Sequence, residues 1–255
     1  MKETRSLLNS LVACGVALAM VSTLAAQTVN QSAAKVVRLK GGARYKTGSS
    51  DWQQLNVGDI VKPGTVIQTA ANSRVDLVLG DGSAPVARPA AGEALSYQPS
   101  AEQNMVRMWE NSLLGIDKLT VMETGADVVT ETQLDLKAGH IFGMVKKMSA
   151  ASKYEVKIPN GVAGIRGTTY DASAEGVIKV FSGSVVLAYV GPDGTVVTQV
   201  IMSLQQFDAR TGVLSPLADL DRTGMDRLIR QLPAGITPMP TSFTPDRTVN
   251  YVSPH

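Results

Sequence analysis

A glycine-rich segment around one arginine is the part of this sequence whose residue types most directly suggest chemistry. Residues 159–170 read PNGVAGIRGTTY, with Arg166 flanked by glycines, and such a loop could hold an anion. However, the spacing is neither Gly-x-Gly-x-x-Gly opening a helix nor the Gly-Lys-Ser/Thr of a P-loop, and a β-rich run follows. An arginine in such a turn more often caps backbone carbonyls or pairs with an acid. We therefore favour a structural role for Arg166 over phosphate binding.

Acidic residues and one histidine are the other candidates for chemistry. Acidic residues recur at every fourth position, at Glu123, Asp127, Glu131 and Asp135. This spacing puts them on one face of a helix or strand, so calcium binding is a hypothesis to consider. No compact Asp-x-Asp loop is present, so a solvated face is the better interpretation. His140 has no second histidine nearby and no serine or cysteine elbow, which favours a packed or surface residue over a base. We expect no enzyme, no metal site and no cofactor.

Composition narrows the class of protein. The chain has 255 residues, with 24 Lys and Arg against 22 Asp and Glu, a net charge of +2, one cysteine and 44% hydrophobic residues. The hydrophobic content is that of a folded globular protein. The small net charge gives no basic field for nucleic acid. One cysteine excludes an intramolecular disulfide framework and a cysteine-cluster zinc site.

Residues 1–26 have the pattern of a signal peptide. Two basic residues lie within the first five positions, and an apolar run over 11–26 follows, which is shorter than a membrane-spanning helix requires. We expect cleavage near Ala25 or Ala26 and a periplasmic or secreted protein. An uncleaved anchor is one alternative. A lipoprotein processed at Cys14 is another, although the apolar run continues past that residue.

The rest of the chain predicts an all-β fold, a sandwich or barrel-like domain of short antiparallel strands. Residues 74–79 alternate so that Val75, Leu77 and Leu79 share one face, and residues 154–158 alternate apolar and charged residues as a half-buried strand does. Runs over 177–181, 185–190 and 195–202 are rich in β-branched residues and are separated by Ser-Gly-Ser and Gly-Pro-Asp-Gly. These separators predict turns, so the three runs are expected to form a meander.

Two stretches depart from the strand pattern. Ser100 and Gln103 resemble a capping box, and apolar residues then recur at helical spacing, which predicts an inserted helix; these residues are Met105, Trp109, Leu113 and Ile116. A short amphipathic helix is predicted over 219–232, within a C-terminal extension that spans 206–232. Residues 233–255 are rich in proline and are expected to be extended, with ordering that depends on a partner.

Taken with its surroundings, the segment 159–170 resembles the FecR domain, the periplasmic module of FecR-type sigma-factor regulators. That family has a Pro-x-x-x-Ala-x-x-Arg-Gly-Thr-like stretch after an alternating strand, and later an x-Gly-Ser-Val strand, which appears here at 181–185. Further matching pieces are found at 36–41, 52–59, 63–69, 81–83 and 134–139. The order and spacing of these pieces extend the resemblance over residues 34–205.

The resemblance implies a role in binding. FecR-type regulators combine a cytoplasmic anti-sigma segment, a membrane span and a periplasmic domain that senses an outer-membrane transporter. Here a transport signal precedes the domain, so no contact with a cytoplasmic sigma factor is expected. The hypothesis is an exported binding or scaffolding module of the cell envelope with a signalling role, which engages an envelope or outer-membrane protein through loops and strand edges.

A glycan- or peptidoglycan-binding protein is the alternative hypothesis. The candidate binding residues are Arg166, Gly164, Gly167, Thr168 and Trp52.

Overall fold

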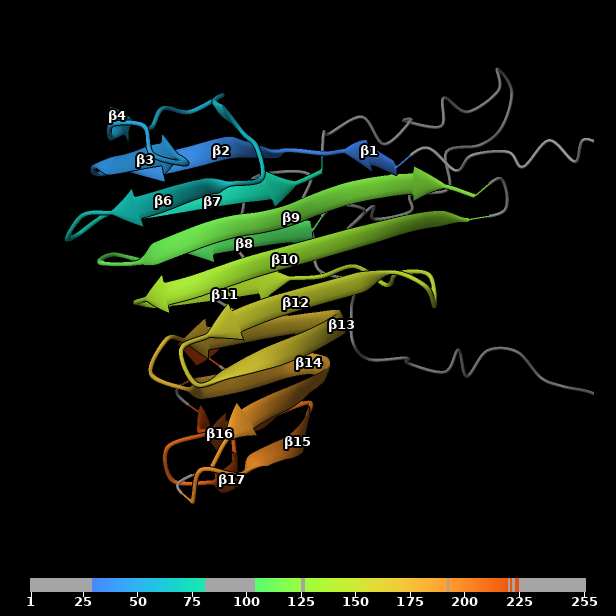
Figure 1. Cartoon of the computed structure of the whole chain (residues 1–255). Helices are drawn as coiled ribbons and strands as arrows, with labels where there is room; N and C mark the ends of the chain where they lie inside the picture. The colour runs from blue at the N-terminus through green and yellow to red at the C-terminus, as the bar shows by residue number, and fades with distance from the viewer. Residues whose placement is uncertain are drawn as a thin grey trace, which may run out of the picture.

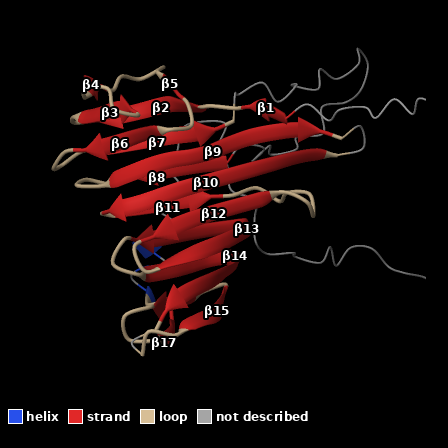
Figure 2. Cartoon of the chain, in the orientation of Figure 1, coloured by secondary structure: helices blue, strands red, loops and turns tan. Residues whose placement is uncertain are grey.

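The protein folds almost entirely as β-structure, as the sequence predicts (Figures 1 and 2). The computed structural model describes residues 29–80, 104–124, 127–191, 193–219, 221 and 223–224. The predicted signal peptide with Cys14, the matching piece at 81–83 and the proline-rich tail lie outside these residues. Among the described residues, none of the helical structure is long and apolar enough to span a membrane.

The strands form one curled, barrel-like sheet whose two halves face each other (Figure 1). We call these halves the first and second layers. The first layer has the order β4 (Gln53–Gln54), β3 (Ala43–Thr47), β6 (Thr65–Thr69), β9 (Leu113–Glu123), β10 (Val128–Ala138), β12 (Lys153–Ile158), β13 (Gly161–Ser173), β14 (Val177–Val190) and β15 (Val196–Met202). In addition, β1 (Val29–Gln31) pairs with β9.

The second layer lies behind the first. Its order is β5 (Ile60–Val61), β2 (Ala34–Lys40), β7 (Arg74–Leu79), β8 (Asn104–Met108), β11 (His140–Met144), β13, β14, β16 (Gln205–Asp208) and β17 (Val213–Pro216). Neighbouring strands are antiparallel except β10 and β12, which run parallel. The last two strands extend the sheet beyond residue 205.

The long strands β13 and β14 join the two layers. The N-terminal part of β13 pairs with β12 in the first layer, and its C-terminal part pairs with β11 in the second. The register between β13 and β14 shifts between Arg166 and Thr169, where both strands bend. The glycine-rich segment therefore lies where the chain passes from one layer to the other.

The core fills the space between the layers and follows the predicted alternation. Val75, Leu77 and Leu79 of β7 are buried in it, as are Val156 and Ile158 of β12. Burying such alternating faces of two layers against each other is what stabilises a sandwich or barrel.

The predicted meander is correct only in part. Residues 177–181 and 185–190 belong to one continuous strand, β14, and the Ser-Gly-Ser between them makes no reversal of the chain. Gly183 there has a φ of +82° and produces a bend opposite Gly167. The next predicted turn, at 191–194, does connect β14 to β15 as a hairpin.

The predicted inserted helix is wrong. Residues 104–108 form β8, residues 113–123 form β9, and a tight turn at Asn111 (φ +53°) separates them. Every residue of β8 is buried, because both of its faces are covered. A strand buried on both faces has no period-2 pattern, so the spacing of its apolar residues imitated a helix.

The start of the second predicted helix agrees with the structure. Asp219, Asp221, Thr223 and Gly224 are helical, and the rest of the predicted segment lies outside the described residues.

Candidate functional site

Four of the five predicted binding residues meet at the bend of β13. Gly167 has a φ of +58°, and its carbonyl faces Gly183, where an added Cβ would lie 2.5 Å from that oxygen. The Thr168 hydroxyl is 2.9 Å from the Arg166 carbonyl and 2.8 Å from the Ser184 carbonyl, and it accepts the Ser184 N–H at 3.2 Å. Only a residue without Cβ fits Gly183, since its backbone is left-handed and closely approached. The Gly-Thr part of the motif thus builds the bend.

Arg166 is exposed but is engaged within the chain. Its Nη2 donates to the Ser149 carbonyl at 2.6 Å and to the Met148 carbonyl at 3.4 Å. It thereby holds the connection between β11 and β12 against the bend. Carbonyl capping is one of the two structural roles, besides pairing with an acid, that the sequence favoured over anion binding. Gly164, two residues earlier, pairs with Glu155 and Val186 inside the sheet.

Trp52, the fifth candidate, lies apart from the other four. Its ring is half-buried beneath Arg44, whose Cζ is 4.6 Å from the ring centroid, and Lys46, whose Nζ is 5.2 Å away. These residues belong to or adjoin β3, which is five strand spacings from β13 in the first layer. At about 4.8 Å per spacing this is roughly 24 Å along the sheet. The structure therefore does not join Trp52 to the bend in one site.

A buried ion pair in the second layer was missed by the sequence reasoning. Asp76 of β7 and Arg107 of β8 are directly opposite each other and fully buried, with Nε–Oδ1 and Nη2–Oδ2 distances of 2.6 and 2.7 Å. The available signal was a single acid inside the otherwise apolar strand 75–79. Its partner, Arg107, lies in the segment that was predicted to be a helix, so the pairing of the two strands was not expected. A bidentate pair of this kind fixes the register of two strands, because a slip would leave two unpaired charges buried.

Asp171 of β13 and Lys179 of β14 are paired with each other. They belong to the same line of cross-strand neighbours in the second layer as Asp76 and Arg107. Burial raises the pKa of Asp171 to about 7, although Lys179 opposes this. Lys179 also donates to Asp221 at 2.8 Å and so holds the start of the C-terminal helix on this face.

His140 of β11 pairs with Ser173 and lies two residues before Phe142, the residue that pairs with Asp171. Its ring stacks on Trp109 with centroids 5.6 Å apart, and burial together with Lys179 lowers its pKa. The sequence favoured a packed or surface histidine, and His140 is half-buried against Trp109.

Glu131 and Asp135 lie on the outer face of β10, whereas Glu123 is on β9 opposite Val128 and Asp127 is in the turn between the two strands. The four acidic residues are therefore solvent-accessible but do not share the one face that was predicted. Glu131 pairs with Lys118 at 2.6 Å, and Asp135 pairs with Lys137 at 2.6 Å. Within the described ranges, no group of three or more histidine, cysteine or acidic side chains is arranged to hold a metal ion.

The strongest candidate for a binding surface is the β15 end of the first layer. Within the described residues, β15 pairs along its length only with β14, so its other side is a free strand edge. Val186 and Val200 are paired across β14 and β15 and are 46% and 47% exposed. Val190 and Val196 form a second such pair, 49% and 76% exposed. We call these four residues the valine face.

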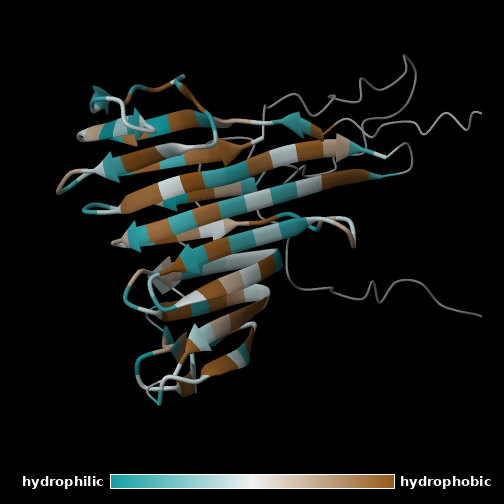
Figure 3. Cartoon of the chain, viewed as in Figure 1, coloured by the Kyte–Doolittle hydropathy of each residue, from teal (hydrophilic) through white to brown (hydrophobic). Residues whose placement is uncertain are grey.

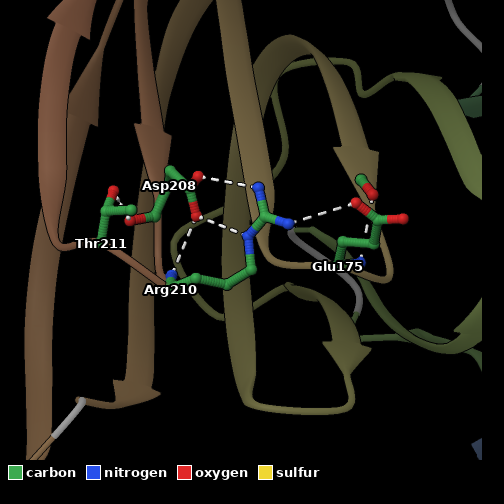
Figure 4. Close-up of polar contacts among 5 residues, drawn as sticks. Glu175, Asp208, Arg210 and Thr211 are labelled. Carbon is green, nitrogen blue, oxygen red and sulfur yellow. Dashed lines mark hydrogen bonds and ion pairs between the residues drawn. The ribbon is translucent and has the colours of Figure 1, made fainter.

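The hairpin of β16 and β17 adjoins this end and is fixed by one arginine (Figure 4). The Arg210 guanidinium donates two hydrogen bonds of 3.1 and 3.0 Å to Asp208, and its backbone N–H donates a third at 2.9 Å. Its Nη1 lies 3.4 Å from Glu175. The bond from Arg210 lowers the pKa of Asp208. These contacts hold the β16–β17 hairpin to the turn between β13 and β14.

Comparison with known proteins found one family that matches part of the chain. Residues 87–186 match the family model described as FecR protein. This match spans 100 of the 255 residues. The match contains the glycine-rich segment and its Arg-Gly-Thr, on which the resemblance was based. No curated protein matches the chain.

Two solved structures are similar to parts of the chain. Both are candidate anti-sigma factors from Parabacteroides distasonis. The first is 12% identical with a TM-score of 0.42, and the alignment covers 63% of each chain. The second is 10% identical with a TM-score of 0.31, and covers 80% of this chain and 72% of the other. The present chain thus spans less than two thirds of the first of these proteins.

Proposed function

We propose that this protein is an exported FecR-domain binding module of the cell envelope, which engages another protein by adding a strand at the β15 edge. The observation that carries the proposal is the combination of a free seven-residue edge with the exposed valine face beside it. Strand addition uses the main-chain groups of an open edge for affinity and the flanking side chains for specificity.

The residues first suggested for binding support this choice by their own contacts. Arg166 and Thr168 make hydrogen bonds within the bend, and Trp52 is covered by two basic side chains. A carbohydrate site would favour exposed aromatic rings, whereas Trp52 is stacked in this way and Trp109 packs between Arg107 and His140. We therefore propose a protein partner in place of a glycan.

The test is capture from an envelope extract with three forms of the protein. Val200→Lys places a charge on the valine face, and Val128→Lys places the same charge on β10, where Val128 is similarly exposed (54%). We expect the wild type and Val128→Lys to retain the same protein, and Val200→Lys to lose it. Equal retention by all three forms would overturn the proposal.

A second arm distinguishes the glycan alternative. The extract is divided, and one half is digested with enzymes that degrade glycan and peptidoglycan. Capture that persists after digestion supports a protein partner. Capture that disappears only in the digested half would instead favour the glycan-binding hypothesis.

A further inference from the structure

The edge strand β15 differs from the other strand edges in the described part of the chain. Its sequence, VVTQVIM, has seven residues without a charge, proline or glycine. By contrast, β4 and β5 have two residues each, and β17 has four and ends in Pro216. Short strands, prolines and charges are the usual protections against edge-to-edge pairing. The β15 edge has none of these protections.

Two hydrogen bonds show which backbone groups of β15 point away from β14. The Met202 N–H donates to Oε1 of Gln205 at 2.9 Å, and the Val200 carbonyl accepts from Nε2 of Gln199 at 2.7 Å. In an antiparallel strand the N–H and C=O groups of alternate residues point to the same side. The free edge is therefore formed by the backbone groups of residues 196, 198, 200 and 202.

We propose that β15 pairs antiparallel with β15 of a second copy, about a two-fold axis at Gln199. In this register Val196 lies opposite the partner's Met202, and Thr198 lies opposite the partner's Val200. All four residues whose N–H and C=O groups point outward then form hydrogen-bonded pairs with outward-pointing residues of the other copy. The inference rests on the proposed function in that it uses the same edge, and it names a second copy as the occupant.

The side chains of β15 suit this two-fold pairing. On the inward side, Val197 lies opposite Ile201 of the partner subunit, and Gln199 lies opposite its own copy. A two-fold interface must be complementary to itself, and here apolar residues meet apolar residues while the central amides meet each other. Since β15 has no charged residue, no like charges face each other across the pair.

Pairing also accounts for the two side-chain amides on the edge. In the single copy, Gln199 and Gln205 satisfy backbone groups that would otherwise lack a protein partner. When a second strand arrives, its backbone replaces these amides. The two amides therefore satisfy edge backbone groups in the monomer and are displaced by backbone hydrogen bonds in the dimer.

Sedimentation equilibrium of the purified protein over a range of concentrations tests the pairing. We expect a reversible dimer for the wild type. Val200→Lys brings the two new lysines near the two-fold axis and should raise the dissociation constant by at least about tenfold. Val128→Lys should dimerise as the wild type does. A wild type that stays monomeric, or a Val200→Lys variant that dimerises equally well, would overturn the proposal.

Cysteine cross-linking tests the register. In a Cys14→Ser background, Gln199→Cys places two sulfurs at the axis, where directly opposed Cα atoms are about 4.5 Å apart in a non-hydrogen-bonded pair. This is within disulfide range. Val197→Cys faces the same side, but its two copies would be roughly 14 Å apart along the strands. We expect a disulfide-linked dimer for Gln199→Cys alone, and equal or reversed cross-linking would contradict the register.

These experiments separate the two proposals. A monomeric protein whose capture of an envelope protein is abolished by Val200→Lys would overturn the second-copy pairing and leave the proposed function standing. A dimer dissociated by Val200→Lys, with capture unchanged, would support the pairing and overturn the proposed function.

Discussion

The outer face of the first layer has two regions that differ in how their side chains are satisfied. Over β9, β10 and β12 it carries several ion pairs, including Lys157 with Asp117 at 2.8 Å and Lys118 with Glu131 at 2.6 Å. Over β14 and β15 it is the valine face, and hydrophobic colouring dominates β15 in Figure 3. Both regions lie on the same sheet, so the backbone does not explain the difference.

The two regions show two ways in which an exposed sheet face can be built. Paired charges keep a face in water and contribute little stability each, because water screens them. Exposed valines beside a free edge leave apolar area that a second strand can cover. The ion-paired region is therefore suited to solvent, and the valine face to a partner.

The largest expected effect comes from a charge that is not on the outer solvated face at all. Arg107→Ala leaves Asp76 buried without its partner, and should lower the free energy of unfolding by about 3–5 kcal/mol. Chemical denaturation measures this loss. The matched control is Lys118→Ala, which removes a cation from an exposed pair. Similar losses in the two variants would show that burial does not separate these ion pairs.

The bend that carries β14 toward the valine face gives the next effect. Gly183→Ala puts a Cβ at a φ of +82° and 2.5 Å from the Gly167 carbonyl. We expect a loss of about 1–3 kcal/mol in thermal or chemical unfolding. Gly164→Ala is the control, because the nearest atom to its added Cβ is 3.7 Å away and its φ is not positive. An unchanged stability for Gly183→Ala would argue against the closely packed bend.

Replacement of Asp171 should have a smaller effect on the free energy of unfolding, and this effect should depend on pH. Its pKa in the folded protein is about 7, raised by burial from 3.8, so the folded state holds this proton in a range where the unfolded chain has lost it. The associated stability is present below about pH 4 and is lost as the pH rises through about 7. Relative to wild type, Asp171→Asn should therefore gain stability between pH 5 and 8, on the order of 1 kcal/mol. Denaturation at several pH values measures this difference, and a constant difference would contradict the raised pKa.

The smallest expected effects are on the two outer regions themselves. Lys118→Ala and Val200→Lys should each change the free energy of unfolding by about 0.5 kcal/mol or less, because both side chains are at the surface. Only Val200→Lys should alter association. A large loss of stability for Val200→Lys would mean that the valine face supports the fold, and would remove the contrast between the regions.

Local sequence patterns were enough to predict the all-β class and the strands β7 and β12, and they carry the FecR resemblance. Each of these depends on local information: side chains alternate across a strand, and a bend with left-handed backbone requires glycine at fixed positions. The carbonyl-capping role favoured for Arg166 follows from the same local reasoning. The FecR-family match includes this segment.

The other features of the fold depend on contacts between segments that are distant in the sequence, and they became visible only in the folded structure. It showed that residues 104–108 and 113–116 lie in two strands, since both faces of β8 are covered by other parts of the fold and its buried residues have no period-2 pattern. It turned a predicted reversal at Gly183 into a bend, because the opposing bend of β13 lies against it. It also paired Asp76 with Arg107, 31 positions apart, and left β15 at the edge of a layer. Pairings between distant strands depend on which strands become neighbours, and that is settled only when the whole sheet forms.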